Sequence, residues 1–259
     1  MLPRARKRFG QHFLTDRHYL ARIVGTIDPK PGDAMVEIGP GTGILTEPLA
    51  AVVAPLHVVE IDRDLAASLR ERFTPDRVVV HEADALVFDF TQLPADLRVV
   101  GNLPYNISTP ILFRIAEIAE RVRDCIFLLQ KEVVERMVAA ADTREYGRLS
   151  VMLQYRFAMS LEVRVPAGAF TPPPKVESAV VRMVPLGTDR LRARDDALFA
   201  RIVSGAFEQR RKTLRNALRA WVSDATFATA DIDPQRRGET LSVAEFVRLA
   251  DAAGATPSG

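Results

Sequence analysis

The chain contains little of the chemistry that binds metals or forms covalent cross-links. Its 259 residues include one cysteine, Cys125, and four scattered histidines, so neither an internal disulfide nor a metal cluster is expected. No apolar run approaches the roughly 18 residues that a membrane-spanning helix requires. The basic N-terminal stretch lacks the apolar core of a signal peptide. These absences predict a cytoplasmic protein without a resident metal.

Basic and acidic residues nearly balance, and a net charge of +2 gives no general argument for binding a polyanion. The basic residues are nevertheless clustered at the N-terminus and again around positions 210–219. Such clusters are candidate phosphate contacts, with a solvated surface as the alternative. The candidate RNA-binding residues are Arg4, Arg6, Lys7, Arg8, Arg210, Arg211, Lys212 and Arg215.

Strand-like and helix-like segments alternate from residue 34 onward, which is typical of an α/β protein with a mostly parallel sheet. Short apolar runs predict strands at 35–38, 57–62, 77–81, 97–101 and 125–129, and two later strands at 161–165 and 176–184. Past Pro185 the pattern becomes helical, which predicts domains at 1–185 and 186–259. Trp221 falls on an apolar helical stripe and is expected in the core of the second domain.

Polar residues follow several of these predicted strands. The glycine turn Gly39-Pro40-Gly41-Thr42-Gly43 follows the first strand, and glycines allow a ligand to approach the backbone closely. Glu60 comes about 20 residues later, the distance at which a carboxylate binds ribose in nucleotide-binding α/β folds. Asp84 ends the third strand, where it either accepts a hydrogen bond from an adenine amine or caps the next turn.

The tetrapeptide Asn102-Leu103-Pro104-Tyr105 ends the fourth strand. Its amide and aromatic groups suit a flat ring that carries an amine, such as adenine. The glycine spacing is not the G-x-G-x-x-G of dinucleotide-binding proteins, and no phosphate-binding loop of the G-K-[ST] kind is present. The polar strand ends therefore favour an extended adenosine-containing ligand, S-adenosylmethionine rather than NAD.

Five ordered motifs resemble the signatures of the ribosomal RNA adenine dimethyltransferases, most closely the KsgA (RsmA) type. They are Arg8-Phe9-Gly10-Gln11-His12-Phe13-Leu14, Val36–Gly43, Asn102–Thr109, Tyr146–Ser150 and Phe170–Ser178. The resemblance extends from about residue 4 to about residue 250 and includes the segment Gln209–Asn216. Where the family often has asparagine, this chain has His12.

The resemblance implies a Rossmann-like class I S-adenosylmethionine-dependent methyltransferase fold, with a seven-stranded sheet and a small helical C-terminal domain. It implies that the cofactor is bound by His12, Leu14, Gly39, Gly41, Glu60, Asp84 and Asn102. It also implies dimethylation of the 6-amino groups of two adjacent adenosines near the 3′ end of 16S ribosomal RNA. The expected partner is this RNA in a precursor 30S-type particle, bound by a monomer through the C-terminal domain.

The residue chemistry suggests how such a transfer would proceed. The Asn102 side-chain oxygen and the Leu103 backbone carbonyl are placed to accept the two hydrogens of the target amine, which would free its lone pair. Tyr105 would stack on the flipped base, and Phe170, next to a stiff run of prolines, is the candidate for its other face.

Three other functions remain open at this point. A large-subunit RNA methyltransferase of the macrolide-resistance type shares many of these motifs. DNA adenine methyltransferases have a related motif, Asn/Asp-Pro-Pro-Tyr, but this chain has Leu103 at the position of the first proline. A ribosome-assembly factor could retain the fold without the activity.

Overall fold

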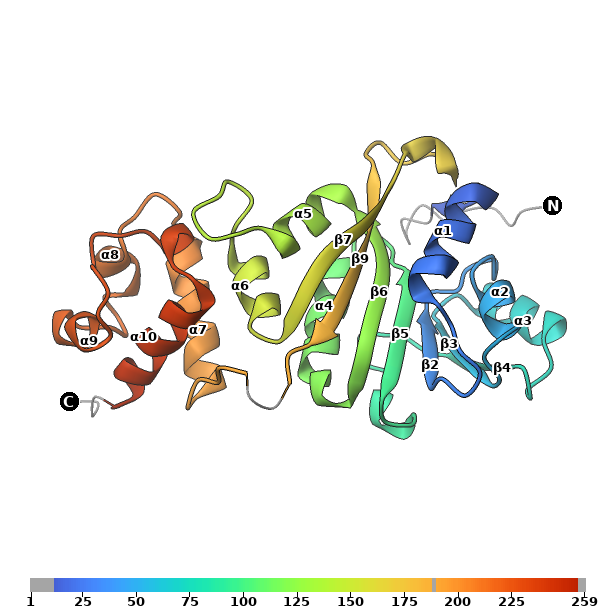
Figure 1. The fold of residues 1–259 in the computed structure, drawn as a ribbon, viewed down its shortest axis with the longest axis horizontal. Helices are drawn as coiled ribbons and strands as arrows, with labels where there is room; N and C mark the ends of the chain where they lie inside the picture. The colour runs from blue at the N-terminus through green and yellow to red at the C-terminus, as the bar shows by residue number, and fades with distance from the viewer. Residues whose placement is uncertain (1–11, 188–189, 256–259) are drawn as a thin grey trace. The chain divides into compact units, whose positions relative to one another are not determined.

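The computed structural model describes residues 12–187 and 190–255, which divide into two units (Figure 1). The first unit comprises the residues up to Val134 together with Ala158–Pro185, and the second comprises Glu135–Phe157 together with the residues from Leu186 onward.

The segment Glu135–Phe157 departs from the predicted division at residue 185, which placed it in the first domain. It groups with the second unit because its helix α6 (Arg148–Gln154) packs against α7 (Asp196–Glu208). The tertiary contact between these helices outweighs their separation along the chain.

The first unit is built on a seven-stranded sheet with the strand order β4-β3-β2-β5-β6-β9-β7. Strands β2 to β6 pair in parallel, and β9 is antiparallel to β6. The bounds are Met35–Ile38 (β2), Leu56–Glu60 (β3), Val78–Glu82 (β4), Leu97–Asn102 (β5), Val122–Gln130 (β6), Phe157–Val165 (β7) and Ser178–Pro185 (β9). The central strands are short and apolar because both faces of a parallel sheet are covered. The predicted α/β class is confirmed.

The strand order reverses beside β2. From β2 the chain adds β3 and β4 on one side, and it then places β5 and β6 on the other. Loops that leave the carboxyl ends of two strands at such a reversal diverge and open a crevice. The glycine turn after β2 and Asn102 at the end of β5 lie on the two sides of this crevice.

The helices of this unit are α1 (Arg17–Ile27), α2 (Thr46–Ala50), α3 (Arg63–Arg72) and α4 (Ser108–Glu117), and the boundary between the units falls within α5 (Lys131–Val138). Aspartates begin two of them: Asp16 accepts hydrogen bonds from two N–H groups of α1, and Asp62 accepts one from α3. Helix α4 begins at Ser108 without a side-chain cap, because the residue at the cap position is the apolar Ile107, and the Ser108 hydroxyl donates to the carbonyl of Tyr105.

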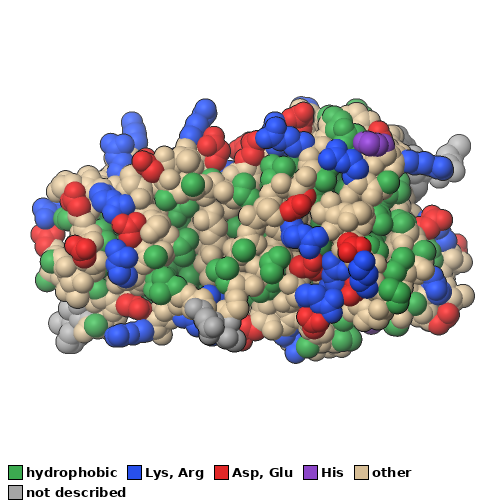
Figure 2. All heavy atoms as spheres, viewed as in Figure 1, with side chains coloured by type: hydrophobic (Ala, Val, Ile, Leu, Met, Phe, Trp, Pro, Cys, Tyr) green, Lys and Arg blue, Asp and Glu red, His purple; other side chains and the backbone are tan. Residues whose placement is uncertain are grey.

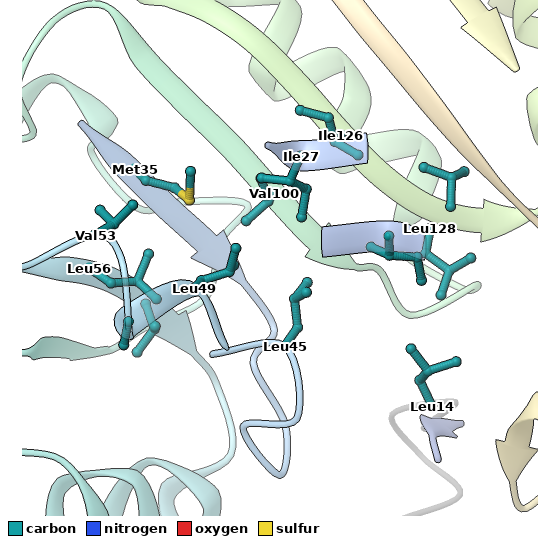
Figure 3. Close-up of a cluster of buried hydrophobic side chains, with 14 of the residues drawn as sticks. Leu14, Ile27, Met35, Leu45, Leu49, Val53, Leu56, Val100, Ile126 and Leu128 are labelled. Carbon is teal, nitrogen blue, oxygen red and sulfur yellow. The ribbon is translucent and has the colours of Figure 1, made fainter. Parts of the chain in front are cut away.

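The core of this unit joins the sheet to α1 and α2 (Figure 3). Met35 of β2, Val100 of β5, Ile27 of α1 and Leu49 of α2 are completely buried in it. Leu14 belongs to the same cluster and lies in the short strand β1 (Phe13–Leu14), which pairs with β8 (Phe170–Thr171). The segment that carries His12 is therefore anchored in the core.

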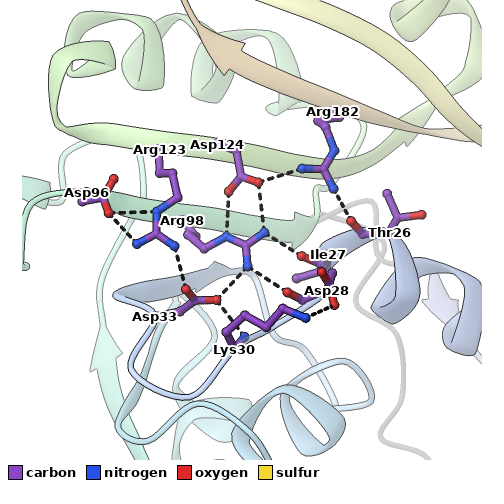
Figure 4. A network of polar contacts seen from close by, with 10 residues as sticks. All are labelled: Thr26, Ile27, Asp28, Lys30, Asp33, Asp96, Arg98, Arg123, Asp124 and Arg182. Atoms are coloured by element: carbon purple, nitrogen blue, oxygen red, sulfur yellow. Dashed lines mark hydrogen bonds and ion pairs between the residues drawn. The ribbon is translucent and has the colours of Figure 1, made fainter.

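A buried polar network ties the C-terminal end of α1 to the first residues of β5 and β6 (Figure 4). Arg98 is 5% exposed; it donates to the carbonyl of Ile27 and forms ion pairs with Asp33 and Asp124. Arg182 of β9 pairs with Asp124 as well. Every charge in this buried group has an opposite charge beside it, which offsets the cost of its desolvation.

The second unit contains α6 and α7 with three further helices, α8 (Leu214–Leu218), α9 (Asp224–Thr229) and α10 (Val243–Ala255). From residue 190 to 255 the described elements are all helical, as predicted. Trp221 corrects a prediction: the residue is 43% exposed and lies beyond the end of α8 at Leu218, whereas Leu214 and Leu218 within that helix are completely buried. No helix in the described residues is both long and apolar enough to cross a membrane.

Candidate functional site

A cavity of about 250 Å³ lies in the first unit at the carboxyl ends of β2, β3, β4 and β5. Its lining includes all seven residues that the sequence predicts for the cofactor: His12, Leu14, Gly39, Gly41, Glu60, Asp84 and Asn102. Leu103 and Tyr105 also line it. Segments from residue 12 to residue 105 are thus brought to one place by the parallel sheet.

The glycine turn forms one wall of the cavity. Gly41 has a left-handed backbone (φ 57°), and its N–H donates to Oε2 of Glu60 over 3.0 Å. A Cβ at position 41 would come within 3.2 Å of the Phe13 ring, a tight contact that adds to the preference of this left-handed backbone for glycine. The other Glu60 oxygen accepts from the N–H of Asp62 at 2.9 Å. Each carboxylate oxygen retains a further lone pair for a ligand.

Glu37 is a second buried acid on the same wall, and no role was predicted for it from the sequence. It is 2% exposed, and the Thr46 hydroxyl donates to its Oε2 over 2.7 Å. Burial, together with the nearby Glu60 charge, raises the pKa of Glu37 to about 8. The signal in the sequence was a charged residue inside the four-residue apolar strand that precedes the glycine turn.

Asp84 and Ile61 lie at the ends of the outer strands. Oδ1 of Asp84 accepts a hydrogen bond from the N–H of Leu86 at 2.9 Å, so this side chain does cap the next turn. Its Oδ2 is not needed for that bond, so capping and ligand binding are compatible. Ile61 lines the cavity and is 47% exposed although it is apolar. A large apolar side chain left open beside two carboxylates fits the face of a ring, a role that sequence reasoning missed.

Asn102 is oriented by a residue 90 positions earlier in the chain. Its Nδ2 donates to the backbone carbonyl of His12 over 3.1 Å. A carbonyl can only accept, so the amide nitrogen must face His12. The Asn102 Oδ1 atom is therefore left free of this contact, as an acceptor at the edge of the cavity.

The rings of His12 and Tyr105 stack with their centroids 5.4 Å apart and an angle of 28° between their planes. Nδ1 of His12 lies 2.8 Å from the Pro172 carbonyl, and the Tyr105 hydroxyl lies 2.7 Å from Oγ of Ser178. Burial raises the pKa of Tyr105, which keeps the phenol neutral. The contact with Ser178 therefore fixes the orientation of the Tyr105 side chain at the cavity, and the His12 ring covers part of one face of the Tyr105 ring.

Phe170 does not lie in this cavity. It is 3% exposed and packs in the core cluster, opposite Leu14 in the β1–β8 pairing. The proline run after it does position the segment, but it places the Phe170 ring inward. The structure therefore does not bring Phe170 to Tyr105 as the sequence-based hypothesis required.

The predicted RNA-binding residues fall into three groups. Arg4, Arg6, Lys7 and Arg8 lie outside the described residues. Arg210 pairs with Glu239, and Arg215 pairs with Asp224. Arg211 and Lys212 are exposed and make no ion pair within the described part of the chain. Figure 2 shows Lys and Arg side chains that project from the surface of the second unit.

The cavity suits a cationic, adenosine-containing cofactor. Its lining holds the carboxyl groups of Glu60 and Asp84 beside the protonated Glu37, and no lysine or arginine among the described residues. A sulfonium or ammonium group gains favourable electrostatic energy in such surroundings, whereas a phosphate would be repelled. The described residues contain no cluster of three or more side chains that could hold a metal ion.

Comparisons with known proteins agree with this geometry. The family described as ribosomal RNA adenine dimethylase matches residues 3–254. The "Ribosomal RNA small subunit methyltransferase A" of Aromatoleum aromaticum is 60% identical over 246 residues, which cover 95% of this chain and 93% of that protein. The protein of the same name from Acinetobacter baylyi is 54% identical over 96% of this chain and 92% of its own length.

Two solved structures share the fold. A dimethyladenosine transferase from Plasmodium falciparum has a TM-score of 0.79 at 23% identity, over 92% of this chain and 96% of that one. The 23S rRNA methyltransferase ErmE has a TM-score of 0.70 at 27% identity, over 93% of this chain and 99% of its own.

Proposed function

Because the chain belongs to the ribosomal RNA adenine dimethylase family, we propose that it transfers methyl groups from S-adenosylmethionine to the 6-amino groups of two adjacent adenosines. The proposed substrate is small-subunit ribosomal RNA near its 3′ end, in a precursor particle. Relatives at 60% and 54% identity that carry the small-subunit name support this substrate over large-subunit RNA. The observation that carries the mechanism is the orientation of Asn102.

The cofactor would lie along the carboxyl ends of the strands. S-adenosylmethionine supplies an electrophilic methyl group on its sulfonium sulfur. Glu60 would accept hydrogen bonds from the ribose hydroxyls, and Asp84 would accept one from the adenine amine, with Ile61 against the ring. Leu14, His12 and the glycine turn would enclose the methionine end.

The target amine is a poor nucleophile because its lone pair is delocalised into the adenine ring. Oδ1 of Asn102 and the carbonyl of Leu103 would accept its two hydrogens. These bonds would favour a tetrahedral nitrogen whose lone pair faces the methyl group. The His12–Asn102 hydrogen bond fixes the amide beforehand, so little reorganisation is required during transfer. Catalysis then depends on positioning, and the amine releases its proton after attack.

Tyr105 would provide the stacking surface for the target base. Extracting the base from its stack costs about a few kcal/mol, and stacking on an aromatic ring returns about 1–3 kcal/mol. The Ser178 contact holds the Tyr105 ring in place, and the partly covering His12 ring leaves its other face for the base.

The direct test is methyl transfer from labelled S-adenosylmethionine to purified precursor subunits, followed by mass mapping of the RNA. We expect label in two adjacent adenosines of the small-subunit RNA. Label confined to large-subunit RNA would identify the macrolide-resistance type of activity instead. RNA binding without any label would favour a non-catalytic assembly factor.

Replacing Glu60 with alanine is expected to weaken cofactor binding about 10- to 100-fold. The ribose would lose hydrogen bonds to a charged acceptor, which are worth roughly 1.5–3 kcal/mol. The N–H of Gly41 would also lose its partner. Calorimetric titration with S-adenosylmethionine measures the change, and Glu71→Ala, an exposed glutamate on α3, is the matched control. Equal affinities in the two variants would remove the ribose role of Glu60.

A further inference from the structure

The second unit exposes an aromatic side chain that the proposed function does not use. Trp221 is the only tryptophan of the chain, and 43% of it is accessible. We propose that Trp221 is a stacking platform for an unpaired base of the bound RNA. This inference rests on the proposed RNA substrate, and it adds a base-contacting residue to a surface so far predicted to touch only phosphates.

Helix α7 contacts one side of the Trp221 ring and holds it in place. The backbone N–H of Trp221 donates to the carbonyl of Leu218 over 2.8 Å, so the residue directly continues the last turn of α8. A Cβ at Gly205 of α7 would come within 2.5 Å of Cζ3 and 3.4 Å of Cε3 of the indole. The ring thus lies against α7 where that helix has no side chain. A ring fixed in this way loses little conformational entropy when a base stacks on it.

The charge around the ring complements a nucleic acid. Between residues 201 and 224 the chain has basic residues at Arg201, Arg210, Arg211, Lys212, Arg215 and Arg219, and acidic residues only at Glu208 and Asp224. Arg219 precedes Trp221 by two residues. Arg201 precedes Gly205 by one helical turn and shares its face of α7. Arg201 and Arg219 are both exposed, and neither forms an ion pair within residues 12–187 and 190–255.

The isolation of Trp221 distinguishes RNA from a protein partner. Between residues 201 and 224 it is the only large apolar side chain with substantial exposure. A protein interface normally requires a contiguous apolar centre. A single aromatic ring among arginines is instead the arrangement that binds single-stranded nucleic acid, through stacking combined with phosphate contacts.

Tryptophan fluorescence tests the stacking directly, because all tryptophan emission of the chain comes from this residue. The full chain is titrated with a single-stranded oligoribonucleotide and, separately, with a blunt RNA duplex. We expect the single strand to quench the emission as it binds, and the duplex to bind through its phosphates with little quenching. Binding of the single strand, detected by filter retention, without quenching would overturn the proposal.

Two variants measure the contribution of the ring. Trp221→Leu is expected to weaken single-strand affinity about tenfold, and Trp221→Phe to restore most of the loss. Leu191→Ala, at another exposed apolar residue of the second unit, is the control and should bind as the unaltered chain does. Equal affinity of Trp221→Leu and the unaltered chain would refute the platform.

The same variant separates this inference from the proposed function. In Trp221→Leu the KM for precursor RNA should rise while turnover at saturating RNA stays unchanged, because the ring lies outside the cofactor cavity. An unaltered chain that shows quenching but no methyl transfer would contradict the proposed function alone. Methyl transfer without quenching would contradict the platform alone.

Discussion

Replacing Asn102 with alanine is expected to lower methyl-transfer turnover about 100- to 1000-fold, the loss typical when one preorganised polar group is removed from a transition state. The substitution removes Oδ1, the acceptor that polarises the target amine, and Nδ2, which holds that acceptor in place through His12. Cofactor affinity should change little, because Glu60 and Asp84 remain. Single-turnover rates with precursor RNA, and calorimetry with S-adenosylmethionine, measure the two effects separately.

The control for this variant is Gln92→Ala, which deletes an amide from an exposed glutamine that does not line the cavity. It should retain most of the turnover. A near-normal rate for Asn102→Ala would refute amine polarisation. A loss of cofactor affinity as large as the loss of rate would instead assign Asn102 to cofactor binding.

Replacing Glu37 with glutamine is expected to remove much of the pH dependence of stability between pH 5 and pH 8. Burial raises the Glu37 pKa from its ordinary 4.5 to about 8 in the folded protein. Between these values the folded state retains a proton that the unfolded chain releases. The free energy of unfolding therefore falls as pH rises through this range, by up to about 5 kcal/mol for a shift of this size.

Glutamine remains neutral at every pH, and its carbonyl can still accept the Thr46 hydroxyl. Glu37→Gln should therefore match the unaltered protein near pH 5 and be more stable than it near pH 8. Urea unfolding of the cofactor-free proteins at both pH values measures this difference. The exposed Glu71→Gln variant is the control. Parallel pH profiles for the unaltered chain and Glu37→Gln would show that Glu37 is charged in the folded state.

Much of the cavity lining could be predicted from the sequence, because residues at the carboxyl ends of parallel strands lie at the same edge of the sheet. Glu60 ends β3, Asn102 ends β5 and Asp84 follows β4, so strand prediction alone placed them at one edge. The glycine turn after β2 was placed at the same edge in the same way. These inferences needed only local patterns and the rule that strands of one direction share an edge.

Other features depended on contacts between distant segments. Periodicity could not show that Phe170 turns into the core against Leu14, because that depends on the pairing of β1 with β8. The same limitation applies to Trp221, which lies past the end of α8 at Leu218 and not within a continuous apolar helix face. Glu135–Phe157 joined the second unit through the packing of α6 on α7.

The amino-acid sequence by itself determined the α/β class, the strand ends that carry the polar groups and the family to which the chain belongs. Only the tertiary structure decided which atom of Asn102 faces the cavity, because its amide nitrogen is taken by the His12 carbonyl. The tertiary structure also decided that Glu37 is buried beside Glu60, and this burial raises the pKa of Glu37. Strand patterns follow from local periodicity, whereas orientation and burial arise from neighbours that meet only when the chain has folded.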